Sequence, residues 1–156
     1  MKLTTFHKDG KDRLGLVDGD HVIDFNQAQP QVDADLRLAL KSGVDLAAAA
    51  KNALSSNAER LPMASLQISA LIPEPGKIIC LGLNYFDHAK EGGRDKPEYP
   101  WFFLRSATSL LAPNEDAILP KVSERLDYEA ELAVVIGKTV KHATIENALD
   151  CVFGYS

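Results

Sequence analysis

The four residues Pro73-Glu74-Pro75-Gly76 divide this chain more sharply than any other feature of its sequence. Each proline lacks a backbone N–H and fixes its own φ, and the glycine adds backbone freedom, so neither a helix nor an inner strand continues through them. Regular structure must therefore form separately on either side. We predict a small N-terminal domain over residues 1–72 and a second unit over residues 73–156.

The first 72 residues predict an antiparallel β meander followed by short helices. Strands are expected at residues 2–7, 13–17 and 21–25, with Asp18-Gly19-Asp20 as a turn. From Asp33 the apolar residues recur at helical spacing up to Leu54, and Gly43 stands where a helix would stop. Two short helices and then a further strand at residues 66–72 follow from this pattern.

Beyond residue 76, short apolar runs alternate with polar loops. Residues 77–82 are typical of a strand that is buried on both faces. Residues 84–91 can form about two turns of helix, which Gly92-Gly93 would end. Further strands are expected at 101–104, 128–136 and 151–155, with a short helix at 144–149. The whole chain is therefore predicted to be α+β.

Charge and composition exclude several kinds of partner. Lys and Arg number 17 against 22 Asp and Glu, and the basic residues are scattered, so the chain lacks the basic patch that nucleic-acid binding requires. No segment approaches the roughly 18 apolar residues of a membrane span, and the N-terminus lacks the apolar run of a secretory signal. Cys80 and Cys151 lie in apolar runs, as buried free thiols do. We expect a cytoplasmic protein that binds neither nucleic acid nor membranes.

Two acidic residues stand inside the apolar strand expected at residues 128–136. Because side chains alternate between the faces of a strand, Glu129 and Glu131 point the same way. Carboxylates this close repel each other unless a cation compensates, and oxygen atoms are the ligands that Mg²⁺ prefers. The pair therefore indicates a metal site. The alternative is the exposed start of an edge strand with both glutamates in water.

Acid–base chemistry has two candidates, His88 and Glu91. A helix places residues three positions apart on one face, where the carboxylate can orient the imidazole and raise its basicity. Such a pair can deprotonate a water molecule or a substrate carbon acid. The alternative is an ordinary ion pair on a surface helix. Arg105 follows the aromatic strand, and its guanidinium suits either a substrate carboxylate or a nearby acid.

These motifs, taken in their order and spacing, resemble the fumarylacetoacetate hydrolase family. The resemblance covers roughly residues 73–156, and residues 1–72 resemble the small domain often found ahead of that catalytic region. The matching segments are Lys77-Ile78-Ile79-Cys80-Leu81-Gly82-Leu83-Asn84-Tyr85 with His88 and Glu91, Phe103-Leu104-Arg105 with Ser109, Asp127-Tyr128-Glu129-Ala130-Glu131-Leu132-Ala133-Val134-Val135-Ile136-Gly137, and Gly154-Tyr155.

The resemblance implies a mixed β-roll, usually in a homodimer, that binds Mg²⁺ or Mn²⁺ through three carboxylates. Glu129 and Glu131 would be two of the metal ligands. His88 and Glu91 would be the catalytic dyad that activates water. The fold class expected is thus a small N-terminal antiparallel β domain with short helices, followed by part of this mixed β-roll.

The same resemblance implies two substrate-binding residues, Asn84 and Arg105, although many relatives have lysine where Arg105 stands. The third metal carboxylate of the family is an aspartate a few residues beyond the Gly-Tyr pair, which here is Gly154-Tyr155, so we expect it to lie beyond Ser156. We interpret residues 73–156 as the first part of the catalytic domain.

Members of this family act on small β-dicarbonyl or 2-oxo acids, including acylpyruvates, oxaloacetate and ring-fission products of aromatic catabolism. We therefore expect a Mg²⁺- or Mn²⁺-dependent hydrolase that cleaves a C–C bond in a small 2,4-dioxo acid through a metal-stabilised enolate. One alternative is an isomerase or decarboxylase acting on related 2-oxo acids. The other is a catalytically silent fragment that needs a partner chain.

Overall fold

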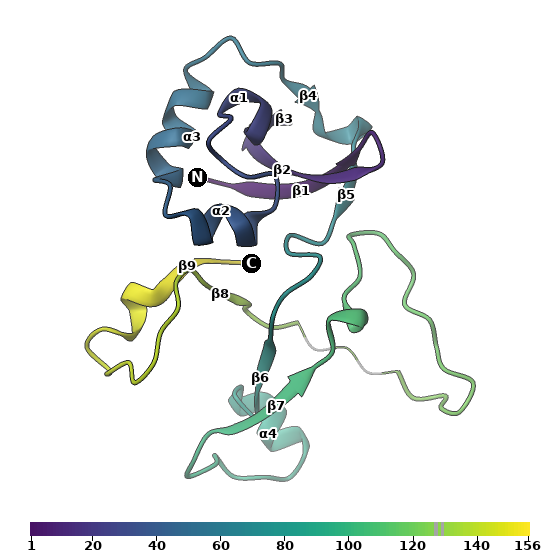
Figure 1. Ribbon diagram of the computed structural model, residues 1–156. Helices are drawn as coiled ribbons and strands as arrows, with labels where there is room; N and C mark the ends of the chain where they lie inside the picture. The colour runs from purple at the N-terminus through teal and green to yellow at the C-terminus, as the bar shows by residue number, and fades with distance from the viewer. Residues whose placement is uncertain (127, 129) are drawn as a thin grey trace.

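The computed structural model describes residues 1–126, 128 and 130–156. The described part of the chain forms a five-stranded sheet with short helices beside it and two separate two-stranded ladders, all antiparallel (Figure 1). Across these residues, no helix is both long enough and apolar enough to cross a membrane. The mixture of helices and antiparallel strands is the α+β class that the sequence predicts.

The five-stranded sheet is built from the first part of the chain, in the order β4-β3-β2-β1-β5. Its strands are β1 (Leu3–Lys8), β2 (Lys11–Asp18), β3 (His21–Asp24), β4 (Leu61–Pro62) and β5 (Gln67–Ser69). A 3₁₀ helix, η1 (Met63–Ser65), joins the last two. The predicted meander is therefore confirmed, and the strand expected at residues 66–72 is shorter than predicted.

Three helices follow β3, and each begins at an aspartate. They are α1 (Phe25–Ala28), α2 (Leu36–Ser42) and α3 (Leu46–Leu54), capped by the carboxylates of Asp24, Asp35 and Asp45. An N-cap carboxylate accepts hydrogen bonds from backbone N–H groups that otherwise lack a partner in the helix. The α2 helix ends as predicted at Gly43, whose φ is 74°. The strand expected to include Phe25 stops one residue earlier, because Asp24 accepts a bond from the Gln27 N–H and starts α1.

The main hydrophobic core lies between this sheet and the three helices. Its buried residues are Leu14, Leu16, Ile23, Phe25, Val32, Leu36, Ala39, Leu46, Ala49, Ala50 and Ala53. At its edge the guanidinium of Arg13 pairs with the carboxylate of Asp24, which is 5% exposed. The hydrogen bond to Asp24 raises the pKa of Arg13 above its ordinary value. Burying Asp24 is tolerable because its charge is paired and hydrogen-bonded.

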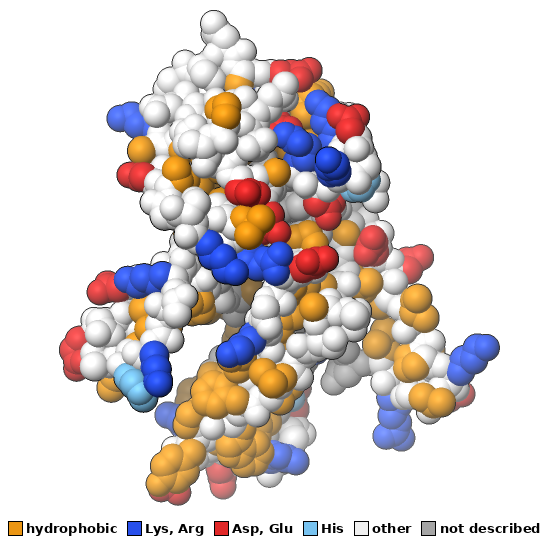
Figure 2. All heavy atoms as spheres, viewed as in Figure 1, with side chains coloured by type: hydrophobic (Ala, Val, Ile, Leu, Met, Phe, Trp, Pro, Cys, Tyr) orange, Lys and Arg blue, Asp and Glu red, His pale blue; other side chains and the backbone are white. Residues whose placement is uncertain are grey.

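The second part of the chain begins with a ladder of two strands, β6 (Ile78–Gly82) and β7 (Trp101–Arg105), with α4 (Phe86–Glu91) between them and η2 (Ala107–Ser109) after them. Ile78 pairs with Arg105, and Gly82 pairs with Trp101. Burial of β6 on both faces is a prediction that the structure contradicts, since Ile79 is 58% exposed. Figure 2 shows apolar side chains gathered over β6, β7 and α4. They are uncovered because this ladder has only two strands.

The last ladder pairs β8 (Val134–Ile136) with β9 (Val152–Tyr155), and η3 (Ala148–Cys151) precedes β9. The helix expected at residues 144–149 is therefore a 3₁₀ helix that begins later. Phe153 of β9 packs against the core of the first sheet, so the two parts of the chain touch. The division into domains at residue 73 stays a prediction. Cys151 is buried and Cys80 is half-buried, and both are free thiols.

Candidate active site

The short helix α4 carries both residues predicted to perform acid–base chemistry. His88 and Glu91 are exposed and three positions apart, so they share one face of the helix. Ala89, which is 2% exposed, lies on the opposite, buried side. Gly92 and Gly93 end the helix as predicted, with φ of 64° at Gly93. Because the Glu91 carboxylate makes no hydrogen bond with a described residue, its orientation of the His88 ring stays a prediction.

Tyr85, immediately before this helix, connects it to a distant part of the sequence. The carbonyl of Tyr85 accepts the N–H of Ala89 over 3.1 Å, which forms the first turn of α4. Its hydroxyl accepts the backbone N–H of Leu132, also over 3.1 Å. Leu132 follows Glu131 directly, so this hydrogen bond brings the base-bearing helix beside the segment with the predicted metal ligands. Tyr85 belongs to the motif that resembles the family, but the sequence alone predicts no role for it.

The segment that carries Glu129 and Glu131, called the acidic segment below, departs from its prediction in one respect. A strand is expected at residues 128–136, but the structure has one only at Val134–Ile136. Ala133, next to this short strand, exchanges both backbone hydrogen bonds with Ser156. Glu131 is exposed and lies before this point, while Glu129 lies outside the described residues. Because Glu131 lies outside the strand, strand alternation does not fix the direction of its side chain.

The two residues predicted to bind substrate are not brought together. Asn84 lies just beyond the Gly82 end of the β6–β7 ladder, and Arg105 lies at its other end, opposite Ile78. At 3.3 Å per residue, the ladder separates their backbones by about 13 Å. Arg105 is exposed, and among the described residues its guanidinium pairs with no carboxylate, so the alternative of a nearby acidic partner is not observed.

The donor chemistry of the acidic segment suits a hard divalent cation. The Glu131 carboxylate is exposed and is engaged by no cation of the described chain, so its oxygens are available. Carboxylate oxygens fit Mg²⁺ and Mn²⁺ alike. Within residues 1–126, 128 and 130–156, no group of three or more His, Cys, Asp or Glu residues is placed to hold a metal. A site for a divalent cation here would therefore need Glu131 together with Glu129, which is not among the described residues.

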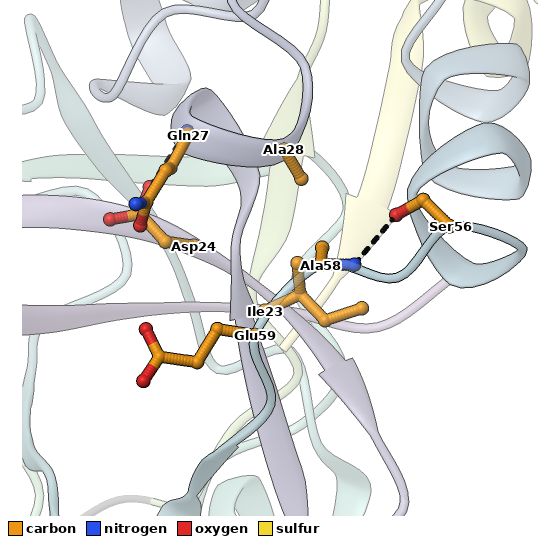
Figure 3. Close-up of a pocket in the computed structure, with 7 residues that line it drawn as sticks. All are labelled: Ile23, Asp24, Gln27, Ala28, Ser56, Ala58 and Glu59. Atoms are coloured by element: carbon orange, nitrogen blue, oxygen red, sulfur yellow. Dashed lines mark hydrogen bonds between the residues drawn. The ribbon is translucent and has the colours of Figure 1, made fainter.

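Two cavities of the described structure lie in the N-terminal part, away from these residues. One of about 300 Å³ lies between α1 and the segment after α3, and Figure 3 shows its lining residues. Two of the polar groups there are already engaged: Asp24 accepts the N–H of Gln27, and Ser56 accepts the N–H of Ala58 over 3.2 Å. We therefore assign no chemistry to this cavity. The candidate site is an exposed surface around α4 and the acidic segment.

Comparison with solved structures identifies the class of fold. Fumarylacetoacetate hydrolase from Exiguobacterium antarcticum matches with a TM-score of 0.74 and 34% identity, over 100% of this chain and 54% of that one. Maleylpyruvate hydrolase from Sphingobium sp. SYK-6, solved with manganese(II) and pyruvate, matches with a TM-score of 0.79 and 30% identity, over 99% of this chain and 56% of that one. The fold is therefore of the fumarylacetoacetate hydrolase type, as predicted.

Sequence comparison leads to the same family. The model for the fumarylacetoacetate (FAA) hydrolase C-terminal domain matches residues 77–156, and the chain belongs to this family. The mitochondrial oxaloacetate tautomerase fahd2 of Xenopus laevis is 39% identical over 92% of this chain and 45% of its own length. The human mitochondrial oxaloacetate tautomerase FAHD2A is 34% identical, again over 92% of this chain and 46% of its own length. The chain spans about half the length of these relatives.

Proposed function

We propose that this protein carries the base and the carboxylate ligands of a divalent-metal-dependent hydrolase that cleaves a C–C bond in a small 2,4-dioxo acid. The observation that supports the proposal is the hydrogen bond from the Leu132 N–H to the Tyr85 hydroxyl. It links the helix that bears His88 to the segment that bears Glu131, so a base and a cation ligand stand in neighbouring parts of the fold.

The reaction adds water across one carbon–carbon bond. His88 takes a proton from water, and the hydroxide oxygen bonds to the carbonyl carbon farther from the substrate carboxylate. The bond between that carbon and the neighbouring CH₂ then breaks, and the CH₂ carbon keeps the electron pair and takes up a proton. An acylpyruvate and water thus give a carboxylate, pyruvate and one proton. Glu91 has the role of orienting the His88 ring, and Asn84 and Arg105 that of holding the substrate.

Glu129 and Glu131 are the residues that would hold the cation. A bound Mg²⁺ or Mn²⁺ supplies Lewis-acid stabilisation of the negative charge that develops on the 2-oxo acid. The solved maleylpyruvate hydrolase contains manganese(II), which supports a divalent cation without choosing between the two metals for this chain. Their oxygen-only ligand preferences are too similar for the residues to decide.

Tautomerisation of a 2-oxo acid is a second candidate function. The Xenopus and human relatives that match 92% of this chain are oxaloacetate tautomerases. That reaction needs only the transfer of a proton between carbon and oxygen, which the same base could perform without adding water to the substrate. A homodimer and a cytoplasmic location also stay predictions for this protein, and the names of these relatives place them in mitochondria.

Calorimetric titration of the purified 156-residue chain with Mn²⁺ and Mg²⁺ tests the metal site. We expect saturable binding that Glu131→Gln removes and that Glu98→Gln, a change at an exposed loop residue, leaves unaltered. A folded chain that binds neither ion would contradict a metal site formed by Glu129 and Glu131 alone.

Two substrates then separate the candidate reactions. With an acylpyruvate, a hydrolase forms pyruvate and a second carboxylate in equal amounts. With the enol form of oxaloacetate, a tautomerase removes the enol absorbance without forming pyruvate. Activity only on the enol of oxaloacetate would replace the hydrolase proposal with the second candidate.

A further inference from the structure

We propose that Tyr85 is a positioning residue, whose hydroxyl holds the acidic segment at a fixed place beside α4. This inference rests on the proposed function, because it assigns Tyr85 a role in presenting Glu131 to a cation. It concerns a residue that touches neither metal nor substrate in the proposed reaction. Its action is through the backbone of the segment that carries the ligand.

Tyr85 is bonded at both of its ends. Its backbone is extended, with φ of −107° and ψ of 129°, and its carbonyl accepts the first hydrogen bond of α4 from Ala89. Its side chain reaches away from the helix to the Leu132 N–H, 47 positions later in the sequence. One residue therefore fixes the start of the base-bearing helix and a point one residue from Glu131.

The Leu132 N–H is available for this bond because of the ladder that follows it. Ala133 forms both of its backbone hydrogen bonds with Ser156. Successive N–H groups of an extended chain point to opposite sides, so the N–H of Leu132 faces away from the strand that contains Ser156. The Tyr85 hydroxyl accepts on that other side, where a further strand would otherwise pair. The acidic segment is thus held from both sides, by backbone at Ala133 and by a side chain at Leu132.

Leu83, two residues before Tyr85, has an unusual backbone conformation. Leu83, between β6 and α4, has a φ of 53°, which is uncommon for a residue with a bulky side chain. A residue held in this region costs free energy and persists where the surroundings require it. Here the chain passes from the end of β6 at Gly82 to the start of α4 at Phe86 within three residues, and Tyr85 is the last of them.

The hydrogen bond between Tyr85 and Leu132 is exposed to solvent, so its loss should change the stability of the chain little. Tyr85 is 41% exposed and Leu132 is 62% exposed, so water can replace the hydrogen bond when it is lost. Removing such a bond costs only about 1 kcal/mol of stability. The chain should therefore stay folded in Tyr85→Phe, which keeps the ring and removes the accepting oxygen. Residues that hold metal ligands in place commonly change metal affinity by about tenfold or more when mutated.

The experiment compares Tyr85→Phe with Tyr99→Phe in the full 156-residue chain. Tyr99 is 70% exposed and lies in the loop before β7, so it controls for loss of a tyrosine hydroxyl. Hydrogen exchange at the Leu132 amide reports the contact itself without any metal. Titration with Mn²⁺ reports the consequence, and far-UV circular dichroism reports the fold.

We expect Tyr85→Phe to speed exchange at Leu132 and to weaken Mn²⁺ binding by about tenfold, with unchanged circular dichroism. Tyr99→Phe should resemble the wild type in all three measurements. Unchanged exchange at Leu132 would mean that the hydroxyl does not hold this amide in solution, and faster exchange with unchanged Mn²⁺ affinity would mean that the contact positions nothing. Either result overturns the inference. If the wild type itself binds no Mn²⁺, the proposed function fails first, and exchange at Leu132 still shows whether the contact exists.

Discussion

The hydroxyl of Tyr85 accepts a hydrogen bond from the backbone N–H of Leu132 over 3.1 Å, although the two residues are 47 positions apart. Local sequence cannot encode this contact, because it depends on where the turn at Leu83 and the ladder of β8 and β9 place the two segments. The contact joins the residue before the histidine-bearing helix α4 to the residue that follows the exposed Glu131.

Replacing His88 should abolish most of the turnover if this residue is the base. General acid–base catalysis typically contributes at least about 10²-fold, so we expect His88→Asn to lower kcat by that factor in the presence of Mn²⁺. The matched control is His142→Asn, at an exposed histidine whose φ of 56° asparagine also adopts readily. Initial rates with an acylpyruvate from pH 6 to 9 measure the effect. Equal rates for the two variants would exclude His88 as the base.

Arg105 should affect substrate binding more than turnover. Its guanidinium is exposed and, within the described part of the chain, pairs with no carboxylate, so it is available to a substrate. A lost hydrogen bond to a charged group costs about 1.5–3 kcal/mol, so Arg105→Gln should raise KM by about 10- to 100-fold. Arg105→Lys should recover part of this loss because it keeps the charge. An unchanged KM in Arg105→Gln, as expected for the exposed control Arg125→Gln, would remove Arg105 from the site.

Periodicity predicts the first part of the chain well because its contacts are local. Leu36 and Ala39 lie one helical turn apart and both are buried, and Gly43 ends that helix with a positive φ. The hairpin between β1 and β2 also has a local signal, Asp9-Gly10, whose φ values of 54° and 75° suit a two-residue turn. This turn lets β2 begin at Lys11, two residues before the predicted start at residue 13.

The second part of the chain is predicted less well because its strands depend on distant partners. The strand expected at residues 128–136 forms only at Val134–Ile136, where β9 supplies a partner strand. In the same way, Ile79 and Phe102 have the composition of a buried sheet, but they are 58% and 66% exposed in a ladder of two strands. An apolar composition indicates that a segment can be buried, but burial also requires another helix or strand that packs against it.

The pair of Arg13 and Asp24 should stabilise the N-terminal part more than any surface ion pair does. Asp24 is 5% exposed, and removing Arg13 would leave its negative charge buried without a cation, with the Gln27 N–H as its remaining hydrogen-bond donor among the described residues. We expect Arg13→Ala to lower the free energy of unfolding by about 3 kcal/mol, against about 0.5 kcal/mol for Asp18→Ala, which removes a half-exposed carboxylate whose partner Arg60 keeps its bonds to backbone carbonyls. Urea unfolding measures both values, and equal losses would show that burial of Asp24 contributes nothing.

The arginine side of this pair should add no pH dependence in the ordinary range. The raised pKa of Arg13 means that its stabilisation is fully present below the ordinary pKa of arginine and is lost only as pH rises through the raised value. The difference in unfolding free energy between Arg13→Lys and the wild type should therefore stay constant from pH 6 to 9. A difference that changes within this range would mean that another group titrates with the pair.

Two glycines of the last ladder form a matched test of its packing. A Cβ atom added at Gly137 would lie 2.8 Å from the Cβ of Phe153 and 3.4 Å from the backbone of the same residue. Because that backbone is held by the hydrogen bond from the Gly137 N–H to the Cys151 carbonyl and by β9, it cannot move away freely. Added atoms in a tight contact commonly cost about 1–3 kcal/mol. Gly154, on the paired strand, has open space within 4 Å of its added Cβ. Gly137→Ala should therefore lower the midpoint of urea unfolding and displace Phe153 from the core, whereas Gly154→Ala should do neither. Equal midpoints for the two variants would show that the close approach of Phe153 to Gly137 does not contribute to stability.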